Sequence, residues 1–331
     1  MTNGGVAQFV KSLSPFFQKD ITVFYRGKRK PNSSFDFAFP LIDIIRFFGF
    51  IMMKRPKKVI INSSLAKVGI MRDGMFILIG NLIGAKTVLY IHGFDEKALG
   101  MKFFLNNGYF KADKIFVLSS QFKKQLQALG CNKPITISYN PIAIDLIEGP
   151  EKNMSKGGKK RLNILMMSRI VGSKGIFIGL EAFANLQKFN VDLHIAGTGS
   201  DLDRAKQYVK SNNLKNVFFH GFITGEKKKR LLSDSDVLLF PTTHKEGLPI
   251  NVLEGLAMGL YIITRPVAGI NDLKKNYHLD LVASTEANDF EQSIISLIKS
   301  GLPTDKINEN QRKAKVDFSP EIIFEKVVLV S

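Results

Sequence analysis

Two glutamates separated by seven residues stand out in the second half of the chain, in the segment EGLPINVLE. Glu246 falls in a loop, and Glu254 lies about one turn into a helix whose first turn suits Pro249. The N–H groups at the helix start, including that of Ile250, form a site for a phosphate or a sugar oxygen. A carboxylate accepts hydrogen bonds from vicinal hydroxyls such as those of a ribose. The open alternative is a loop charge at Glu246 and a solvated helix residue at Glu254.

Two cations follow a strand-like apolar run at residues 162–167. Arg169 comes directly after the run, and Lys174 precedes the next helical segment. Both cations are thus expected at the carboxyl edge of a sheet, where Arg binds phosphate oxygens bidentately and Lys adds a point charge. That arrangement suits a diphosphate. Two ordinary surface cations are the alternative, in a chain with 47 Lys and Arg residues.

Glycines and one histidine also stand at strand ends or helix starts. Gly197 and Gly199 form a tight turn after a strand. Such a turn lets a ligand approach the backbone, and a purely structural turn is the alternative. Gly4 and Gly5 open a helical pattern and either cradle an anion or merely start the helix. His92 ends a strand-like run and is expected to face a ligand cleft, with a hydrogen-bonded core histidine as the alternative.

Several kinds of chemistry find no support in the sequence. It contains no G-x-S-x-G elbow, no P-loop and no dinucleotide fingerprint, which disfavours serine hydrolysis and hydride transfer. The remaining histidines show no metal-ligand spacing with one another or with the single cysteine, so no structural zinc is expected. These residues are His194, His220, His244, His278 and Cys131.

Composition narrows the class further. The chain has 331 residues, enough for about two domains, and its 45% hydrophobic and 23% charged residues are ordinary for a globular protein. One cysteine cannot form an internal disulfide, which favours a reducing compartment. Apolar tracts are interrupted before 18 residues, and no signal peptide is recognised, so a transmembrane span is not expected.

The net charge of +18 is uneven. Residues 1–150 carry 21 Lys and Arg against 9 Asp and Glu, whereas residues 151–331 carry 26 against 20. A basic first half favours nucleic acid, anionic lipid or diphosphate ligands, and charge alone does not choose among them.

The elements that position these residues alternate between strand and helix. Strands buried on both faces imply parallel sheets, and the β-α-β alternation predicts two doubly wound α/β domains in series. The segment 146–161 combines Gly, Pro and Lys, which is typical of a linker, and places the domain boundary near residue 155. Helices are expected at 121–129 and 176–189. The expected strands are 59–62, 88–91, 115–118 and 135–138 in the first half, and 162–167, 191–196, 217–219, 237–240 and 261–264 in the second.

Several motifs together resemble the retaining nucleotide-sugar glycosyltransferases of family 4, and they occur in the family's order. EGLPINVLE is similar to the family's most recognisable motif, SRIVGSKG to its diphosphate-binding Arg and Lys, and HIAGTGS to its following turn. In the first half, IHGFD, ADKIFVLSSQFKKQL and YNPIAID are similar to landmarks of the acceptor domain. FSPEIIFEKV resembles the terminal helix that returns to the first domain, so the resemblance covers the chain from about Gly4 to its end.

The resemblance implies the GT-B fold, two Rossmann-like doubly wound domains facing a central cleft. It implies an acceptor domain at 1–155, a nucleotide-sugar domain at 156–318 and a returning helix at 319–331. A nucleotide sugar, UDP- or GDP-linked, would be the donor, and a hydroxyl of a glycan or lipid-linked sugar the acceptor. The sugar would keep its anomeric configuration, by front-face attack assisted by the leaving phosphate. Two cations would replace a metal, so no metal or other cofactor is expected.

The resemblance also implies a role for each matching residue. Arg169 and Lys174 would neutralise the donor diphosphate, Glu254 would bind the ribose, and Glu246 and His92 would contact the donor sugar. The remaining donor contacts would come from Gly4, Gly5, Gly197, Gly199, Gly247, Leu248 and Ile250.

One departure concerns the start of the chain. Family members begin with a strand ahead of the Gly-rich turn, and Met1, Thr2 and Asn3 leave no room for it. The sequence therefore predicts either a truncated start or a first sheet that lacks a central strand and exposes two edges.

The segment 40–58 mixes an apolar helix with a cluster of cations. It suits docking on an anionic bilayer, with a core helix and a solvated basic tail as the alternative. We expect a cytoplasmic protein attached to the inner face of the plasma membrane and acting in bacterial cell-surface polysaccharide synthesis. A nucleotide-sugar epimerase of the same fold, an inactive truncated transferase and a nucleic-acid-binding module are the alternatives. The charge fits the last of these, but no aromatic-basic motif supports it, and no nucleic-acid partner is expected.

Overall fold

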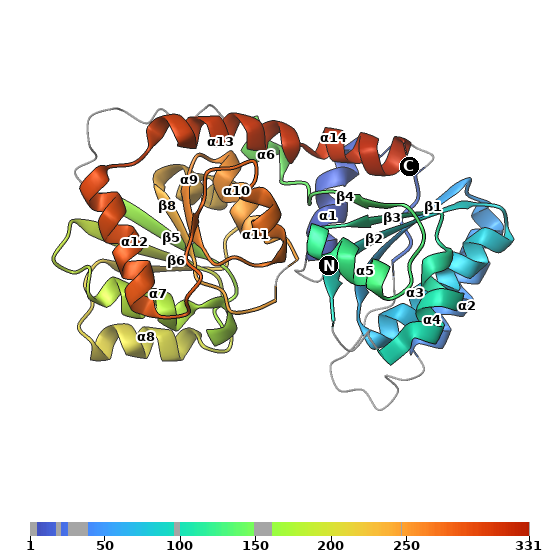
Figure 1. The fold of residues 1–331 in the computed structure, drawn as a ribbon, viewed down its shortest axis with the longest axis horizontal. Coiled ribbons are helices and arrows are strands. Elements are labelled where there is room, and N and C mark those ends of the chain that lie inside the picture. The colour runs from blue at the N-terminus through green and yellow to red at the C-terminus, as the bar shows by residue number, and fades with distance from the viewer. Residues whose placement is uncertain are drawn as a thin grey trace. The chain divides into compact units, whose positions relative to one another are not determined.

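A computed structural model describes residues 5–17, 21–25, 39–95, 100–148, 161–245 and 247–330 (Figure 1). The chain forms two compact units, Met1–Pro141 with Pro320–Ser331, and Ile142–Ser319. The division falls at residue 141 rather than near residue 155. One reason is local, because the Ile142 N–H donates to the Phe318 carbonyl and the short helix α6 (Ile144–Ile147) contacts α10 (Ile250–Ala257).

The first unit contains one four-stranded parallel sheet with the order β1-β2-β3-β4. Neighbouring strands are directly hydrogen-bonded, so the expected gap at the centre of this sheet does not exist among the described strands. A further strand would join at the β1 or the β4 edge. The strands are β1 (Lys58–Leu65), β2 (Lys86–Phe94), β3 (Lys114–Val117) and β4 (Ile135–Ile137), and each contains most of an expected strand.

Strand alternation places helices on both faces of this sheet. On one face, Phe9 of α1 packs against the rings of Tyr90 and His92 at centroid distances of 4.5 and 4.9 Å. On the other face, Ser63 of β1 hydrogen-bonds to Asp73 of α3. The helices are α1 (Gly5–Leu13), α2 (Phe39–Lys54), α3 (Lys67–Leu82), α4 (Lys102–Asn107) and α5 (Ser120–Ala128).

The first unit is completed by residues that follow the second unit. The helix α14 (Pro320–Phe324) continues into a π-helical turn at 325–329 and packs on α1. Phe324 lies 5.9 Å from the Phe16 ring, and Lys58 donates to the Val328 carbonyl at 2.7 Å. The expected return of the terminal helix to the first domain is therefore confirmed.

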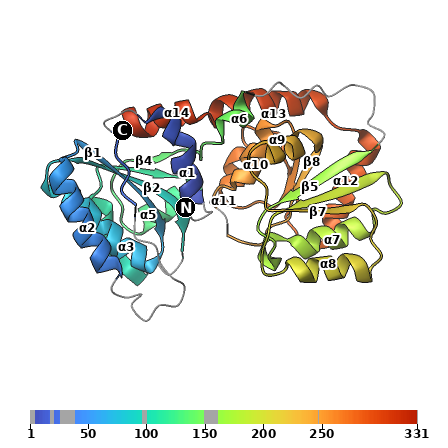
Figure 2. The same ribbon diagram turned by 180° about the vertical axis from the view of Figure 1, so that it is seen from behind.

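The second unit contains a six-stranded parallel sheet with the order β10-β9-β8-β5-β6-β7. The order runs outward from β5 in both directions, so the sheet is doubly wound and reverses between β5 and β8 (Figure 2). The strands are β5 (Leu162–Met167), β6 (Val191–Ala196), β7 (Val217–Gly221), β8 (Val237–Phe240), β9 (Tyr261–Thr264) and β10 (Asp280–Leu281).

Helices cover both faces of this second sheet and bury its aliphatic strands. Leu180, Leu193 and Val237 have no exposed surface in this core. Apart from α6 and α10, these helices are α7 (Ile176–Ala184), α8 (Leu202–Ser211), α9 (Gly225–Asp234), α11 (Ala268–Leu273), α12 (Ala287–Ser300) and α13 (Thr304–Asp317). In the described part of the chain, no helix combines the length and apolarity needed to cross a bilayer.

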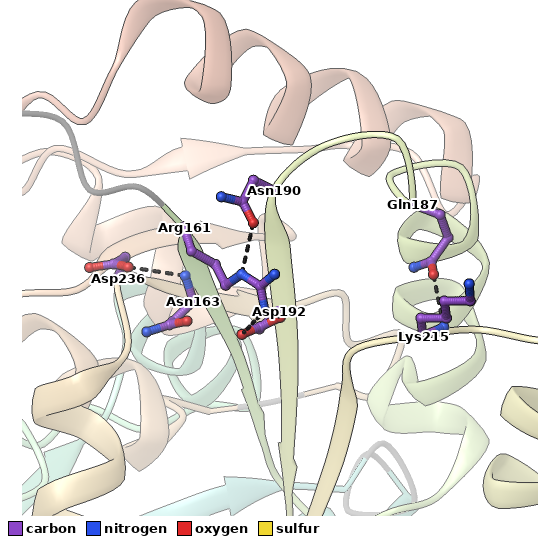
Figure 3. A network of polar contacts seen from close by, with 7 residues as sticks. All are labelled: Arg161, Asn163, Gln187, Asn190, Asp192, Lys215 and Asp236. Carbon is purple, nitrogen blue, oxygen red and sulfur yellow. Dashed lines mark hydrogen bonds and ion pairs between the residues drawn. The ribbon is translucent and has the colours of Figure 1, made fainter.

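A polar network ties the amino ends of these strands together (Figure 3). Arg161, just before β5, donates to Asn190 at 2.7 Å and to Asp192 at 3.0 Å. The Asn163 N–H donates to the Asp236 carboxylate at 3.0 Å, which joins β5 to β8. The network thus fixes the end of the sheet opposite to the one where parallel strands place ligands.

Candidate functional site

The loops after β5 and β8 meet at the point where the strand order reverses. The Ser173 carbonyl accepts hydrogen bonds from the N–H groups of Thr243 and His244, both at 2.9 Å. Asn251 of α10 donates to the Met167 carbonyl at the end of β5, at 2.8 Å. Three segments from different parts of the second unit are therefore locked together at the position where doubly wound sheets bind ligands.

Arg169 and Lys174 lie together in this locked region. Lys174 is 8% exposed, and its ammonium lies 6.0 Å from the Phe240 ring. Burial, with a further contribution from the charge of Arg169, lowers the pKa of Lys174 to about 8. A buried ammonium beside a second cation is stabilised by a bound anion, so this pair favours a diphosphate over an uncharged ligand.

His244 belongs to the same cationic cluster. Burial lowers the pKa of this histidine, and the charges of Lys174 and Arg169 lower it further. Its ring is therefore biased toward the neutral form at neutral pH. A neutral imidazole can both donate and accept a hydrogen bond, which suits a sugar or phosphate oxygen.

The glycine turn after β6 is required by backbone packing. Gly197 has φ +144°, and a Cβ there would lie 1.9 Å from the Ser168 carbonyl oxygen. A Cβ on Gly199 would lie 2.1 Å from the Ile170 carbonyl oxygen. Close backbone packing thus accounts for both glycines without a ligand. Their contacts with the donor stay a prediction.

The start of α10 is built as expected, with one shift. Pro249 is the residue before the helix rather than a member of its first turn, and α10 begins at Ile250. The Pro249 carbonyl accepts the first helical hydrogen bond, from Val252 at 3.2 Å. Leu248 is buried, and the Gly247 carbonyl accepts from the Gly269 N–H at 2.7 Å. The loop that leads from β8 into α10 is therefore held against the start of α11.

Glu254 is buried, so the alternative that it is a solvated helix residue is wrong. It is 1% exposed and forms an ion pair of 2.5 Å with Lys228 of α9. Burial raises the pKa of Glu254, and Lys228 opposes that shift. A buried carboxylate needs such a partner, and ribose hydroxyls can supply the same hydrogen bonds.

His92 lies in the first unit and is described with its own surroundings. Its Nε2 is 2.9 Å from the Asn62 Oδ1, which is an acceptor and so places the ring proton on Nε2. Burial lowers the pKa of His92 to about 3, with a hydrogen bond to Asn140 opposing the shift. His92 is thus a neutral histidine of fixed tautomer. Gly5 is the first residue of α1.

The predicted site residues of the second unit come together around one end of its sheet. Arg169 and Lys174 follow β5, Gly247 and Leu248 precede α10, and Ile250 is the first residue of α10. Gly4 and Glu246 lie outside the described residues. Sequence reasoning missed His244, Lys228 and Asn251. His244 lies in the loop after β8 and could have been found from that position, whereas His92 lies within β2 rather than at its end. The Lys228 partner of Glu254 depends on the packing of α9.

A pair of histidines was also missed. His194 Nδ1 and His220 Nε2 are 3.0 Å apart, because the residues lie on the neighbouring strands β6 and β7. Sequence spacing alone does not reveal such cross-strand pairs. Among the described residues, no group of three or more His, Cys, Asp or Glu side chains is placed to hold a metal ion.

The two units together have the GT-B fold. The solved structure of HepE from Anabaena, in complex with UDP and glucose, superimposes with a TM-score of 0.69 and 16% identity, over 90% of this chain and 83% of that one. A likeness at this identity concerns the fold, and two Rossmann-like domains are confirmed.

The sequence of the second unit is similar to a known family. Residues 150–314, which are 165 of the 331 residues, match the family model of the glycosyl transferases group 1. An uncharacterized glycosyltransferase of Methanocaldococcus jannaschii is 26% identical over 62% of this chain and 53% of its own length. The amylovoran biosynthesis glycosyltransferase AmsK of Erwinia amylovora is 26% identical over 47% of this chain and 40% of its own. The chain thus spans about half the length of the curated relatives it matches.

Proposed function

We propose that this protein transfers a sugar from a nucleoside-diphosphate sugar to a hydroxyl group of a glycan or a lipid-linked acceptor, in polysaccharide synthesis. The observation that carries this proposal is the buried Lys174 ammonium beside Arg169, at the reversal point of a doubly wound sheet. The names of relatives such as AmsK support the polysaccharide context. The HepE complex supports UDP as the nucleotide to test first.

The charges of the site suggest how its residues act. Arg169 and Lys174 bind the diphosphate and neutralise the negative charge that develops on it as the sugar–phosphate bond breaks. Glu254 accepts hydrogen bonds from the ribose, in exchange for part of its contact with Lys228. With two cations on the leaving group, the reaction needs no metal. The resemblance to family 4 supports retention of configuration, with the acceptor hydroxyl attacking from the face that the phosphate leaves.

Donor binding is the first test. Calorimetric titration of the full chain with UDP, GDP and their sugar conjugates, in the presence of a chelator, should show binding. The affinity of an Arg169→Ala/Lys174→Ala variant should be about 100-fold lower or worse. The anomeric proton of the product, followed by NMR, then reports retention or inversion. Folded protein that binds no nucleotide would refute the donor site, and binding restored only by a divalent ion would refute metal independence.

The acceptor and the location are a separate part of the proposal. We propose that the acceptor is presented at the inner face of the plasma membrane, to which the protein attaches from the cytoplasm. The helix α2 supports attachment, because Leu41, Ile45, Phe48 and Met52 are exposed along it while Phe47 and Ile51 are buried. Cell fractionation tests this, since recovery of all the protein in the soluble fraction at low salt would contradict it.

A further inference from the structure

The helix α3 buries two charged side chains and exposes a row of apolar ones. Arg72 and Asp73 are 4% and 2% exposed, and Arg72 donates through Nε to the Asp73 carboxylate at 2.7 Å. The water-facing positions of a helix that packs on a sheet are ordinarily polar. In α3 they are instead apolar and follow helical spacing, at Val68, Met71, Met75, Leu78 and Leu82.

The helices beside α3 extend this apolar surface. The three helices α2, α3 and α4 lie side by side, with α3 in contact with both of the others (Figures 1 and 2). Met53 of α2 is 80% exposed and Phe103 of α4 is 71% exposed. Most of the exposed large hydrophobic side chains in the described part of the chain lie on this surface, which we call the three-helix face. Its members are Leu41, Ile42, Ile45, Phe48, Met52, Met53, Val68, Met71, Met75, Leu78, Leu82, Phe103 and Phe104.

A groove runs along the three-helix face between α3 and α4. Its volume is about 210 Å³, and Met71, Met75, Leu78, Phe103 and Phe104 supply most of its lining. Gly74 and Gly108 permit the close approach of the two segments, since a Cβ on Gly108 would lie 3.2 Å from the Gly74 Cα. An apolar groove lined by flexible methionines suits a hydrocarbon chain.

The charges on the face select its occupant. Among the described residues of α2, α3 and α4, every exposed charged side chain is a cation, namely Arg46, Lys54, Lys67 and Lys102. The acidic side chains of these helices, Asp43 and Asp73, are buried. A large apolar surface whose exposed charges on these three helices are all positive complements the hydrocarbon and the phosphates of an anionic leaflet.

We propose that the three-helix face inserts into an anionic phospholipid leaflet and that one acyl chain occupies the groove between α3 and α4. This inference deepens the proposed function by naming the membrane surface that the first unit contacts. It extends attachment from α2 alone to three helices. The donor site in the second unit takes no part in it, so vesicle binding and nucleotide binding can fail separately.

Vesicle flotation of the full chain tests the surface. Vesicles of phosphatidylcholine with about 30% phosphatidylglycerol should carry the protein, and high salt should release it. A Leu78→Ser/Phe103→Ser variant should partition about tenfold more weakly or worse. Phe222→Ser is the matched control, because Phe222 is 58% exposed in the second unit and should not change partitioning. Calorimetry with UDP on each variant separates loss of folding or of the donor site from loss of membrane binding.

Tryptophan fluorescence tests the groove. The chain has no tryptophan, so one introduced residue is the only reporter. Lipids brominated on their acyl chains should quench Leu82→Trp, which lies on the face outside the groove, and Met75→Trp in the groove, and should leave Phe222→Trp unquenched. Quenching at Leu82→Trp alone would overturn the groove assignment.

Three results would overturn the whole inference. These are equal partitioning into neutral vesicles, no vesicle binding by folded protein, or a dimer that Leu78→Ser/Phe103→Ser dissociates in the absence of lipid. The last result would assign the face to a second copy of the chain.

Discussion

Gly175 passes so close to Pro241 that a Cβ on the glycine would lie 2.2 Å from the proline carbonyl oxygen. Gly175 has φ +81°, and Gly221 has the similar φ of +65° with nothing within 4 Å of its Cβ position. Both positions disfavour a side chain through backbone conformation, but only Gly175 adds a collision. The pair thus separates local backbone strain from packing between the loops after β5 and β8.

Gly221→Ala should lower the free energy of unfolding by about 1 kcal/mol, because an alanine is disfavoured by about that much in the left-handed backbone region. Gly175→Ala should lower it by at least about 3 kcal/mol, because the β8 loop must move as well. Denaturant unfolding of both variants measures the difference. Equal losses would show that the two loops do not depend on their close approach.

Arg161 and Arg169 flank the same strand at its opposite ends. Arg161→Ala removes the contacts to Asn190 and Asp192 and should lower the free energy of unfolding by about 1 kcal/mol or less, since the pair is partly exposed. It should leave UDP affinity unchanged. Arg169→Ala should weaken UDP binding about tenfold or more and leave the unfolding free energy nearly unchanged. An equal effect of both variants on UDP affinity would indicate a nonspecific charge effect.

The pKa of Lys174 predicts how nucleotide binding depends on pH. In the protein without nucleotide, Lys174 loses its proton around pH 8. A bound diphosphate favours the charged ammonium. Binding therefore takes up a proton above about pH 8, and affinity should fall as pH rises through that value. Calorimetry in buffers of different ionisation enthalpy measures the proton uptake. Lys174→Arg should abolish the fall, and a fall that persists in this variant would assign it to another group.

His92 predicts a loss of stability in acid. Its pKa is about 3 when folded, against 6.5 for a free histidine, so the unfolded chain binds more protons between these values. The contribution of His92 to stability is therefore complete above pH 6.5 and declines as pH falls toward 3. The free energy of unfolding of His92→Gln should decline less from pH 7 to pH 5 than that of the parent. His278→Gln, at an exposed histidine, is the control and should follow the parent.

Much of the fold could be predicted because β5, β6, β8 and β9 are buried on both faces. Such strands appear in the sequence as mainly apolar runs, and all four have the predicted bounds. The order of the strands in a sheet is harder to predict than their bounds, because it depends on packing between distant segments. The sequence left two interpretations for the first unit, a truncated start or a missing central strand, and the described strands β1 to β4 are contiguous.

The candidate site was predictable where function depends on position along a strand, and less so where it depends on a partner. Arg169 and Lys174 follow directly from the end of β5. The Lys228 partner of Glu254 lies in a run of four cations, and only the packing of α9 on α10 selects it. The outward apolar stripe of α3 was missed for a similar reason, since an apolar helix gives no sign of which face is covered.

The return of α14 to the first unit has a consequence for how the protein is made. During synthesis, all of the second unit leaves the ribosome before residues 320–330 are available to pack on α1 and to receive the Lys58 hydrogen bond. The first unit to be translated is therefore the last to be completed. A chain shortened to end at residue 319 should therefore hold a finished second unit beside a first unit that is still open to proteases.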